Sequence, residues 1–224
     1  MADKIVNPTS DIIQTYGRMR FLRLEEPKAF QQGQTPRWEA TQILDPSDVR
    51  GAEDIKRLLD TAAAIGQQTY GCVPLALRKL RTKFVAGTPA LDLNDPKPAE
   101  DGIQIPFPDG DAEKWAKYAG YKGMLIVTSH NKKKKPGVAK VNGTKAIPGE
   151  KGYPYDGCYG LLSSTIWGHA THGAYAKRVG VNLRGVQFVK DGPPFQQTEI
   201  DAEDEFTPLA EDNSSGVATS DGWD

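Results

Sequence analysis

The second half of the chain contains short segments in which apolar and polar residues alternate, and this pattern restricts the fold more than any other feature. In residues 178–189, valine and leucine fall on one side of an extended chain, while Arg178, Asn182 and Arg184 fall on the other. A strand that buries one face and exposes the other has this period of two. Gly185 interrupts the alternation and predicts a β-bulge. The other strands predicted in this half are residues 121–131, 138–143 and 158–170.

The first half adds two strands and the helices. Residues 16–27 alternate basic and apolar side chains, with Arg18 and Arg20 on one side and Met19 and Phe21 on the other, and residues 37–44 form a second predicted strand. The period then changes, and the predicted elements are a helix that begins at Ser47 or Asp48 and ends at Gly66, a short basic helix within 74–84, and another helix within 110–120. About five strands with one or two inserted helices predict a mainly β (α+β) fold, a small, partly open five-stranded barrel.

The charges of the chain are segregated, although the net charge of the whole is only −1. All 28 Lys and Arg residues lie at or before Lys190, together with 19 acidic residues, so this part carries +9. The remaining residues, 191–224, contain ten acidic residues and no basic residue. We therefore predict a flexible arm at 1–15, a barrel domain at 16–195 with a loop insertion at about 70–110, and an acidic disordered tail at 196–224. A basic body with an acidic tail is typical of nucleic-acid-binding proteins.

Several classes of protein are not indicated. There is no apolar run of about eighteen residues and no secretory signal pattern, so we expect no membrane partner and a location in the cytoplasm. Cys72 and Cys158 form no metal-binding pair and are interpreted as small core residues. Phosphate-loop, nucleophile-elbow and HExxH motifs are absent. His169 and His172 form an HxxH pair without a nearby carboxylate or cysteine, which predicts a loop at a strand end and no metal site. No catalytic residue and no cofactor is expected.

Binding of single-stranded nucleic acid requires a cationic groove for phosphates and exposed aromatic rings for bases. The predicted barrel contains both, interleaved along the sequence. Trp167 and Phe188 are assigned to the core, because they lie within apolar strands. The run of four lysines at residues 132–135 has two interpretations that remain open, a solvated hairpin tip and a phosphate contact. The candidate DNA-binding residues are Arg18, Arg20, Arg23, Arg37, Trp38, Lys117, Tyr118, Tyr121, Lys122, Lys132, Lys133, Lys134, Lys135, Lys140, Lys151, Tyr153, Tyr155 and Arg184.

The order of several motifs resembles a family of bacteriophage single-stranded-DNA-binding proteins long catalogued as phage proteins of unknown function. These motifs are IPFPDGD, YAGYKGMLIVTSHNKKKKPGV, YDGCYGLLSSTIWGH, GVNLRGVQFVKDGPPF and AEDEF, and the similarity extends from about Gly17 to Phe206. The resemblance implies an OB-fold barrel that binds single-stranded DNA without strong sequence preference and has neither catalytic activity nor a cofactor. It also implies a place in phage DNA replication or recombination, in the cytoplasm of the infected bacterium.

The C-terminal segment is similar in kind to the acidic tails of other replicative single-strand binders. Such a tail is expected to compete with DNA for the basic body and, once displaced, to bind phage or host replication and recombination proteins such as polymerase or helicase. It also leaves open a homodimer held together by the tails. The alternatives to a single-strand binder are a virion structural or assembly protein that contacts duplex DNA and a metal-dependent nuclease. The candidate partner-binding residues are Glu211, Asp212, Asp221, Trp223 and Asp224.

Overall fold

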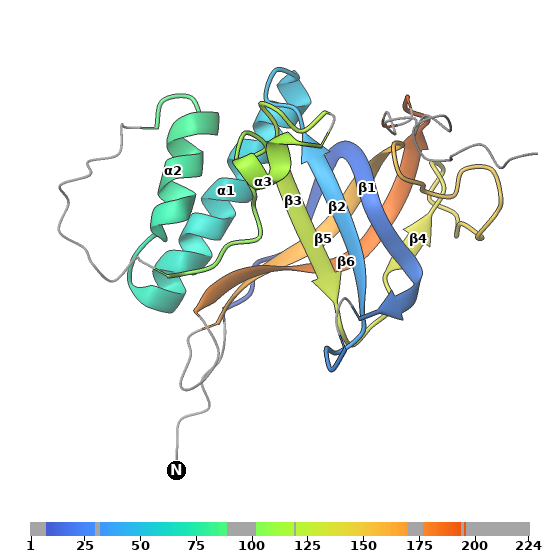
Figure 1. Ribbon diagram of the computed structural model, residues 1–224, viewed down its shortest axis with the longest axis horizontal. Helices are drawn as coiled ribbons and strands as arrows, with labels where there is room; N and C mark the ends of the chain where they lie inside the picture. The colour runs from blue at the N-terminus through green and yellow to red at the C-terminus, as the bar shows by residue number, and fades with distance from the viewer. Residues whose placement is uncertain are drawn as a thin grey trace, which may run out of the picture.

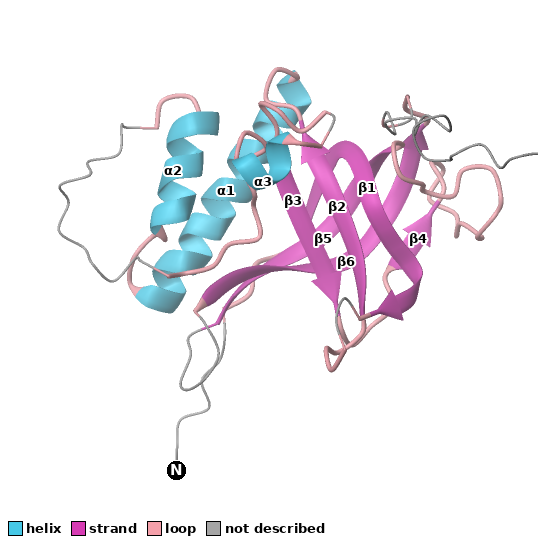
Figure 2. Ribbon diagram, viewed as in Figure 1, coloured by secondary structure: helices cyan, strands magenta, loops and turns pink. Residues whose placement is uncertain are grey.

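The computed structural model describes residues 8–29, 32–88, 102–118, 120–169, 177–193 and 195. A β-barrel lies beside a pair of helices, and a short edge strand lies on the opposite side of the barrel from the helices (Figure 1). Figure 2 shows the same division between cyan helices and magenta strands. The strands are β1 (Ile13–Lys28), β2 (Arg37–Leu44), β3 (Leu125–Asn131), β4 (Gly137–Ala139), β5 (Tyr159–His169) and β6 (Arg178–Lys190). The helices are α1 (Val49–Tyr70), α2 (Leu75–Phe84) and α3 (Glu113–Ala116).

Five of the strands form the barrel in the order β3-β2-β1-β5-β6, and a parallel pairing of β3 with β6 closes it. The predicted five-stranded barrel and the OB-fold are confirmed. The barrel is closed where the sequence predicted a partly open one, because His130 of β3 pairs with Asn182 of β6. Residues 104–108 extend this seam. The amide of Val179 donates to the Gln104 carbonyl (2.9 Å), and the amide of Thr128 donates to the Pro106 carbonyl (3.0 Å).

The four lysines do not form a hairpin tip, which corrects the first interpretation of this run. The strands on either side of them, β3 and β4, both pair with β6 in the parallel sense. The chain therefore leaves β3, passes through residues 132–136 and continues along β6 in the same direction. We call residues 132–135 the lysine loop. The loop lies beside the edge of β6, between the positions at which β3 and β4 pair with that strand.

The core is built from the inward side chains of the barrel and from one face of α1. Met19, Leu162 and Leu183 are fully buried inside the barrel, and Ile55 and Leu58 of α1 belong to the same apolar cluster. Buried and more exposed residues alternate along most of β1 and β5, as the period of two predicts, whereas β2 and β3 contain runs of consecutive buried residues. Both cysteines are buried and free, which agrees with their assignment to the core. Phe188 packs against this core, whereas Trp167 is half-buried on the outer surface beside Gly180.

Helix α1 is longer than the sequence predicted. Its N-cap is Asp48, whose side chain accepts a hydrogen bond from the Gly51 amide, and it continues past Gly66 to a C-cap at Gly71. Gly71 has a φ of 72°, a left-handed conformation that glycine adopts without strain. Gly66 is required for packing. A Cβ there would lie 2.5 Å from Cδ of Pro74, so glycine allows the segment that follows α1 to fold back against the helix.

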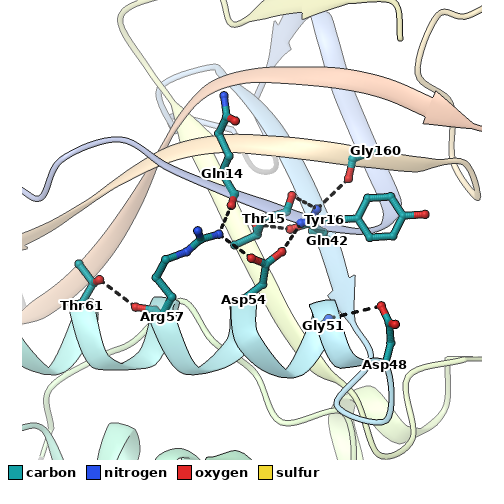
Figure 3. A network of polar contacts seen from close by, with 10 residues as sticks. All are labelled: Gln14, Thr15, Tyr16, Gln42, Asp48, Gly51, Asp54, Arg57, Thr61 and Gly160. Atoms are coloured by element: carbon teal, nitrogen blue, oxygen red, sulfur yellow. Dashed lines mark hydrogen bonds and ion pairs between the residues drawn. The ribbon is translucent and has the colours of Figure 1, made fainter.

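A buried polar network joins α1 to β1 and β2 (Figure 3). The Asp54 carboxylate accepts hydrogen bonds from the backbone amide of Tyr16 (2.7 Å) and from the Arg57 guanidinium (2.5 Å). Arg57 also donates to the carbonyl of Gln14. Inside the barrel, the amide nitrogen of Gln42 donates to the carbonyls of Thr15 (2.9 Å) and Gly160 (3.2 Å). The network satisfies backbone groups of β1 at the point where α1 lies beside that strand.

Two irregularities redirect side chains on the outer surface. The register between β1 and β2 shifts after Arg20, and Phe21 has a φ of 51°. Phe21 consequently lies with the outward residues, near Arg20 and Tyr118, and not on the side of Met19 as predicted. The predicted bulge at Gly185 is confirmed, since neighbouring residues of β5, Ser163 and Ser164, pair with Gly185 and Leu183. It leaves Arg184 exposed.

Three predicted boundaries change. Strand β1 begins at Ile13, so the last residues of the expected arm are strand, held by pairing with β5. The expected loop insertion at about 70–110 contains α2, and residues 89–101 lie outside the described residues. The helix expected within 110–120 is reduced to the four residues of α3. Before it, the Asp111 side chain accepts a hydrogen bond from the Gly123 amide in the turn that leads to β3 (2.8 Å). The acidic tail at 196–224 also lies outside the described residues.

Candidate nucleic-acid interface

The outer surface of β1, β5 and β6 presents one continuous strip of polar, aromatic and basic side chains. The pairing of β1 with β5 aligns Gln14 with Ser163, Tyr16 with Leu161, and Arg18 with Tyr159. The pairing of β5 with β6 extends these rows to Gly185, Gln187 and Lys190. Their inward neighbours are buried, so the alternation of the strands places the whole set on one face. We call this set the interface strip, which consists of Gln14, Tyr16, Arg18, Tyr159, Leu161, Ser163, Gln187 and Lys190.

Aromatic rings and cations meet in the middle of the strip. The rings of Tyr16 and Tyr159 are stacked, with centroids 5.9 Å apart and an interplanar angle of 17°. The guanidinium of Arg50 lies 4.5 Å from the Tyr16 centroid, and the ammonium of Lys190 lies 4.9 Å from the Tyr159 centroid. A flat ring next to a cation suits a nucleotide, because the ring can stack on a base while the cation attracts the adjoining phosphate.

One end of the strip opens into a basic groove. The groove has a volume of ≈ 570 Å³, and its lining includes Lys133, Lys134, Lys135 and Arg184. The side chain of Asn131 fixes the lysine loop by accepting hydrogen bonds from the amides of Lys133 (2.9 Å) and Lys134 (3.0 Å). Among the described residues, none of the four lysines of the loop forms an ion pair with a carboxylate. Their positive charges therefore remain available to an anionic ligand.

Arg18 lies at the other end of the strip, and two more of the predicted residues, Arg20 and Tyr118, lie beside that end, with the Arg20 guanidinium 5.2 Å from the Tyr118 centroid. The ring of Phe195 lies between the two arginines, with centroid distances of 3.8 Å to Arg18 and 4.4 Å to Arg20. Arg18 also donates a hydrogen bond to the carbonyl of Pro193. The residues that immediately precede the acidic tail thus lie on the basic surface.

Tyr121 was predicted to be a stacking platform, and the structure shows that it is part of a core. Its side chain is fully buried and packs with Ile43, Ile126 and Trp115. Burial raises the pKa of Tyr121 to about 12, against the effect of the nearby Arg20 guanidinium. The sequence is misleading here, because the turn before β3 folds back over the outer face of β2 and β3. Tyr118, three residues earlier, remains half-buried at the surface.

Arg23, Arg37 and Trp38 lie where the end of β1 pairs with the start of β2, and Trp38 is paired with Asn131, the residue directly before the lysine loop. Arg37 forms an ion pair with Glu39 (3.7 Å), and Arg23 pairs with Glu39 across the strands. Burial raises the pKa of Glu39 against the lowering effects of both arginines. Trp38 packs partly against the core. His130, opposite Glu39, has a pKa lowered to about 4 by burial and by the charges of Arg37, Lys132 and Arg178.

The remaining predicted residues are scattered around these features. Tyr153 lines a groove beside the strip, and burial together with nearby Glu25 raises its pKa to about 12. The hydroxyl of Tyr155 donates to Asp191 (2.9 Å). Lys140 forms an ion pair with Glu150 (2.7 Å). Lys117, Lys122, Lys132 and Lys151 are exposed.

Some predicted features cannot be placed. The tail residues Glu211, Asp212, Asp221, Trp223 and Asp224, and also His172, lie outside the described residues. Within the described part of the chain, no group of three or more His, Cys, Asp and Glu side chains is arranged to hold a metal ion. In the same part, no helix has the length and apolar character needed to span a membrane.

Sequence reasoning missed the centre of the strip. Tyr16 lies two residues before Arg18, and Arg18 lies two residues before Arg20. The alternation in β1 therefore places Tyr16 on the same face as the two arginines. Tyr159 and Lys190 belong to different strands, and only the pairing of β5 with β6 brings them together. No local signal relates Arg50, on α1, to the ring of Tyr16.

Comparisons with known proteins identify the family of the chain. The family model described as Enterobacter phage Enc34, ssDNA-binding protein, matches residues 10–217. Putative protein p50 of Acyrthosiphon pisum secondary endosymbiont phage 1 is 35% identical over 102 residues, which are 46% of this chain and 51% of that protein. The match thus spans about half the length of this curated relative.

Solved structures share the fold. The single-stranded DNA-binding protein from bacteriophage Enc34 in complex with ssDNA has a TM-score of 0.54 and 20% identity, over 87% of this chain and 100% of that chain. The single-stranded DNA-binding protein gp2.5 encoded by bacteriophage T7 has a TM-score of 0.50 and 15% identity, over 94% of this chain and 99% of that chain. Because the family model covers nearly the whole barrel, the chain belongs to the family of phage ssDNA-binding proteins represented by that of Enterobacter phage Enc34.

Proposed function

We propose that this protein binds and coats single-stranded DNA during phage replication or recombination in the cytoplasm of the infected bacterium, largely without sequence preference. The observation that carries the proposal is the continuity of the interface strip with the basic groove, since both include Ser163 and Gly185 lies in the same row. A strand laid along this path would meet cations and rings in alternation. The complex between the Enc34 protein and ssDNA supports the same class of ligand.

The proposed mechanism combines phosphate neutralisation with base stacking. Lys133, Lys134 and Arg184 face the same groove and would neutralise successive phosphates. Tyr16 and Tyr159 offer rings in the middle of the path. Stacking on an aromatic side chain contributes about 1–3 kcal/mol per base and tolerates every base, because each base has a flat π-face. Neither contact depends on the order of bases, which explains binding without sequence preference.

The acidic tail completes the proposal. With ten acidic residues after Lys190 and an excess of positive charge before it, the tail competes with DNA for the strip, and DNA binding frees it for replication and recombination proteins. The contact of Phe195 with Arg18 and Arg20 supports this competition, because it holds the residue directly before the tail against the basic surface. Exchange of tails between two copies would give a homodimer by the same contacts.

The test is binding to a single-stranded and a duplex oligonucleotide at several salt concentrations, for the natural chain and for Lys133→Glu/Lys134→Glu. We expect preference for the single strand. If both lysines contact phosphates, the slope of log affinity against log salt falls by roughly 0.7 per residue in the variant. The control is Lys79→Glu at an exposed lysine of α2, and α2 lies on the far side of α1 from the barrel (Figure 1).

Three results would count against the proposal. An unchanged slope in the double variant shows that the lysine loop is solvated and makes no phosphate contact. Equal or tighter binding to the duplex favours a virion protein that contacts packaged DNA, and cleavage of labelled DNA on addition of magnesium or manganese favours a nuclease.

A further inference from the structure

The segment that follows the lysine loop encloses an apolar groove above part of the interface strip, where Leu161, Ser163 and Gln187 line it. Strand β4 pairs with the edge of β6, and residues 140–148 fold back from β4. The space between this segment and the outer face of β5 and β6 has a volume of ≈ 990 Å³. Sites for small molecules are typically about 300–1,000 Å³, so the space is large enough for more than one planar ring. Leu161 and Val186 line it on the barrel side, and Val138 and Ile147 line it on the loop side. We call this space the apolar slot.

Hydrogen bonds hold the slot open. The amide of Ala146 donates to the Val138 carbonyl (2.9 Å), and the amide of Lys140 donates to the Thr144 carbonyl (2.8 Å). From the barrel, the side-chain nitrogen of Gln187 donates to the carbonyls of Lys140 (3.0 Å) and Val141 (3.1 Å). Since the loop is tied both to itself and to β6, a ligand that enters the slot does not have to order it first.

The slot opens directly beside the basic groove. Lys135, Ser163 and Gly185 line both spaces. A row of cations therefore runs along the mouth of an apolar space, with Lys135 at the boundary. A single-stranded nucleic acid has a matching division into a charged part and a less polar part, because its anionic backbone carries flat, weakly hydrated rings on one side. In duplex DNA the rings are paired and stacked inside the helix, so they are not available to such a space.

We propose that the apolar slot receives unpaired bases of the bound strand while the lysine loop and Arg184 hold its phosphates, and that the slot distinguishes single strands from duplex. This inference rests on the proposed function and adds to it the site of base burial. Tyr153 also lines the slot and provides an aromatic ring within it. The bases lose contact with water without any hydrogen bond that depends on their identity, which preserves binding to any sequence.

The variants that test the slot are Ile147→Ala and Ile147→Glu. The Ile147 side chain is 51% exposed, so neither change is expected to disturb the fold. Val141→Ala and Val141→Glu are matched controls, because Val141 is an exposed apolar residue of the same loop, 60% exposed, that does not line the slot. Both glutamate variants add one negative charge to the same loop. A difference between the Ile147 and the Val141 variants therefore reports the position of the side chain and not the added charge.

Binding is measured with an intact oligonucleotide and with one of equal length that contains abasic sites, which keep every phosphate and remove the bases. We expect Ile147→Glu to weaken binding of the intact strand about tenfold, the effect of losing a stacked base. The same change should have little effect on the abasic strand. A 2-aminopurine base in the intact strand should be protected from acrylamide quenching by the natural chain and by the Val141 variants, and less protected by the Ile147 variants.

Equal weakening of the intact and the abasic strand by Ile147→Glu, or equal effects at Ile147 and Val141, would overturn the slot as a base site. In either case the natural chain would still bind the single strand with a steep salt dependence, so the proposed function would remain. Absence of salt-dependent binding to any single strand by the natural chain is the distinct result that refutes the proposed function itself.

Discussion

At the scale of single residues, Phe195 occupies part of the surface that we propose for DNA. Its ring lies against Arg18 and Arg20 and belongs to the same apolar cluster as Tyr118 and Tyr121. A nucleobase on this surface would meet the same guanidinium groups. Each cation–π contact of this kind contributes about 0.5–1 kcal/mol at an exposed site, so the ring is held weakly enough for DNA to displace it.

Phe195→Ala is therefore expected to tighten binding of single-stranded DNA about two- to fivefold at low salt, the equivalent of one such contact that no longer has to be broken. Fluorescence anisotropy with a labelled oligonucleotide measures the change. Phe195→Tyr keeps the ring and should bind like the natural chain. Weaker binding by Phe195→Ala would mean that the ring supports the surface and does not compete with DNA.

At the scale of elements, α1 and β1 depend on one buried carboxylate. Asp54 is 6% exposed and satisfies both the backbone amide of Tyr16 and the guanidinium of Arg57. Without it, the Tyr16 amide would be left without its hydrogen-bond acceptor beside α1, and Arg57 would lose its carboxylate partner (Figure 3). The contacts of Asp54 also hold in place the segment of β1 that contains Gln14 and Tyr16, two residues of the interface strip.

Asp54→Ala is expected to lower the free energy of unfolding by about 2–4 kcal/mol, the cost of an unsatisfied buried donor together with a lost charge-assisted hydrogen bond. Urea denaturation followed by circular dichroism measures it. The control is Glu53→Ala at the exposed neighbouring position, for which a change within about 0.5 kcal/mol is expected. Equal losses in the two variants would show that the network contributes no more than the helix surface.

At the scale of the whole molecule, the segregation of charge is the dominant feature. The body before residue 191 carries +9 and the segment after Lys190 carries −10. Opposite charges joined by one chain attract each other, and salt weakens this attraction over a distance of about 10 Å at 0.1 M. The proposed competition between tail and DNA is therefore strongest at low salt.

Deletion of residues 207–224 should tighten binding of single-stranded DNA at low salt and abolish binding to replication partners. The first effect follows from removal of a competing polyanion and should diminish as salt is raised. Titrations at low and high salt, together with a pull-down by an immobilised partner polymerase or helicase, measure both effects. Unaltered affinity at low salt would refute competition by these residues, and retained partner binding would place the docking site elsewhere.

The sequence by itself determined the type and approximate place of most strands, because a period of two can be recognised wherever one face is buried. It also determined the bulge at Gly185, the burial of both cysteines and the segregation of charge, all of which are local or compositional. The resemblance to phage single-strand binders rested on motifs in β3, β5 and β6, and the family match confirmed it.

Only the tertiary structure decided which surface the candidate residues share. Tyr121 became core because a turn folds over β2 and β3, and the lysine loop became the edge of a groove because β3 and β4 pair with the same strand. Tyr16, Tyr159 and Lys190 are neighbours through strand pairing between segments far apart in the chain. Alternation tells which residues share one face of one strand, but the register between strands depends on packing of the whole barrel, so a surface assembled from several strands is not determined by local pattern.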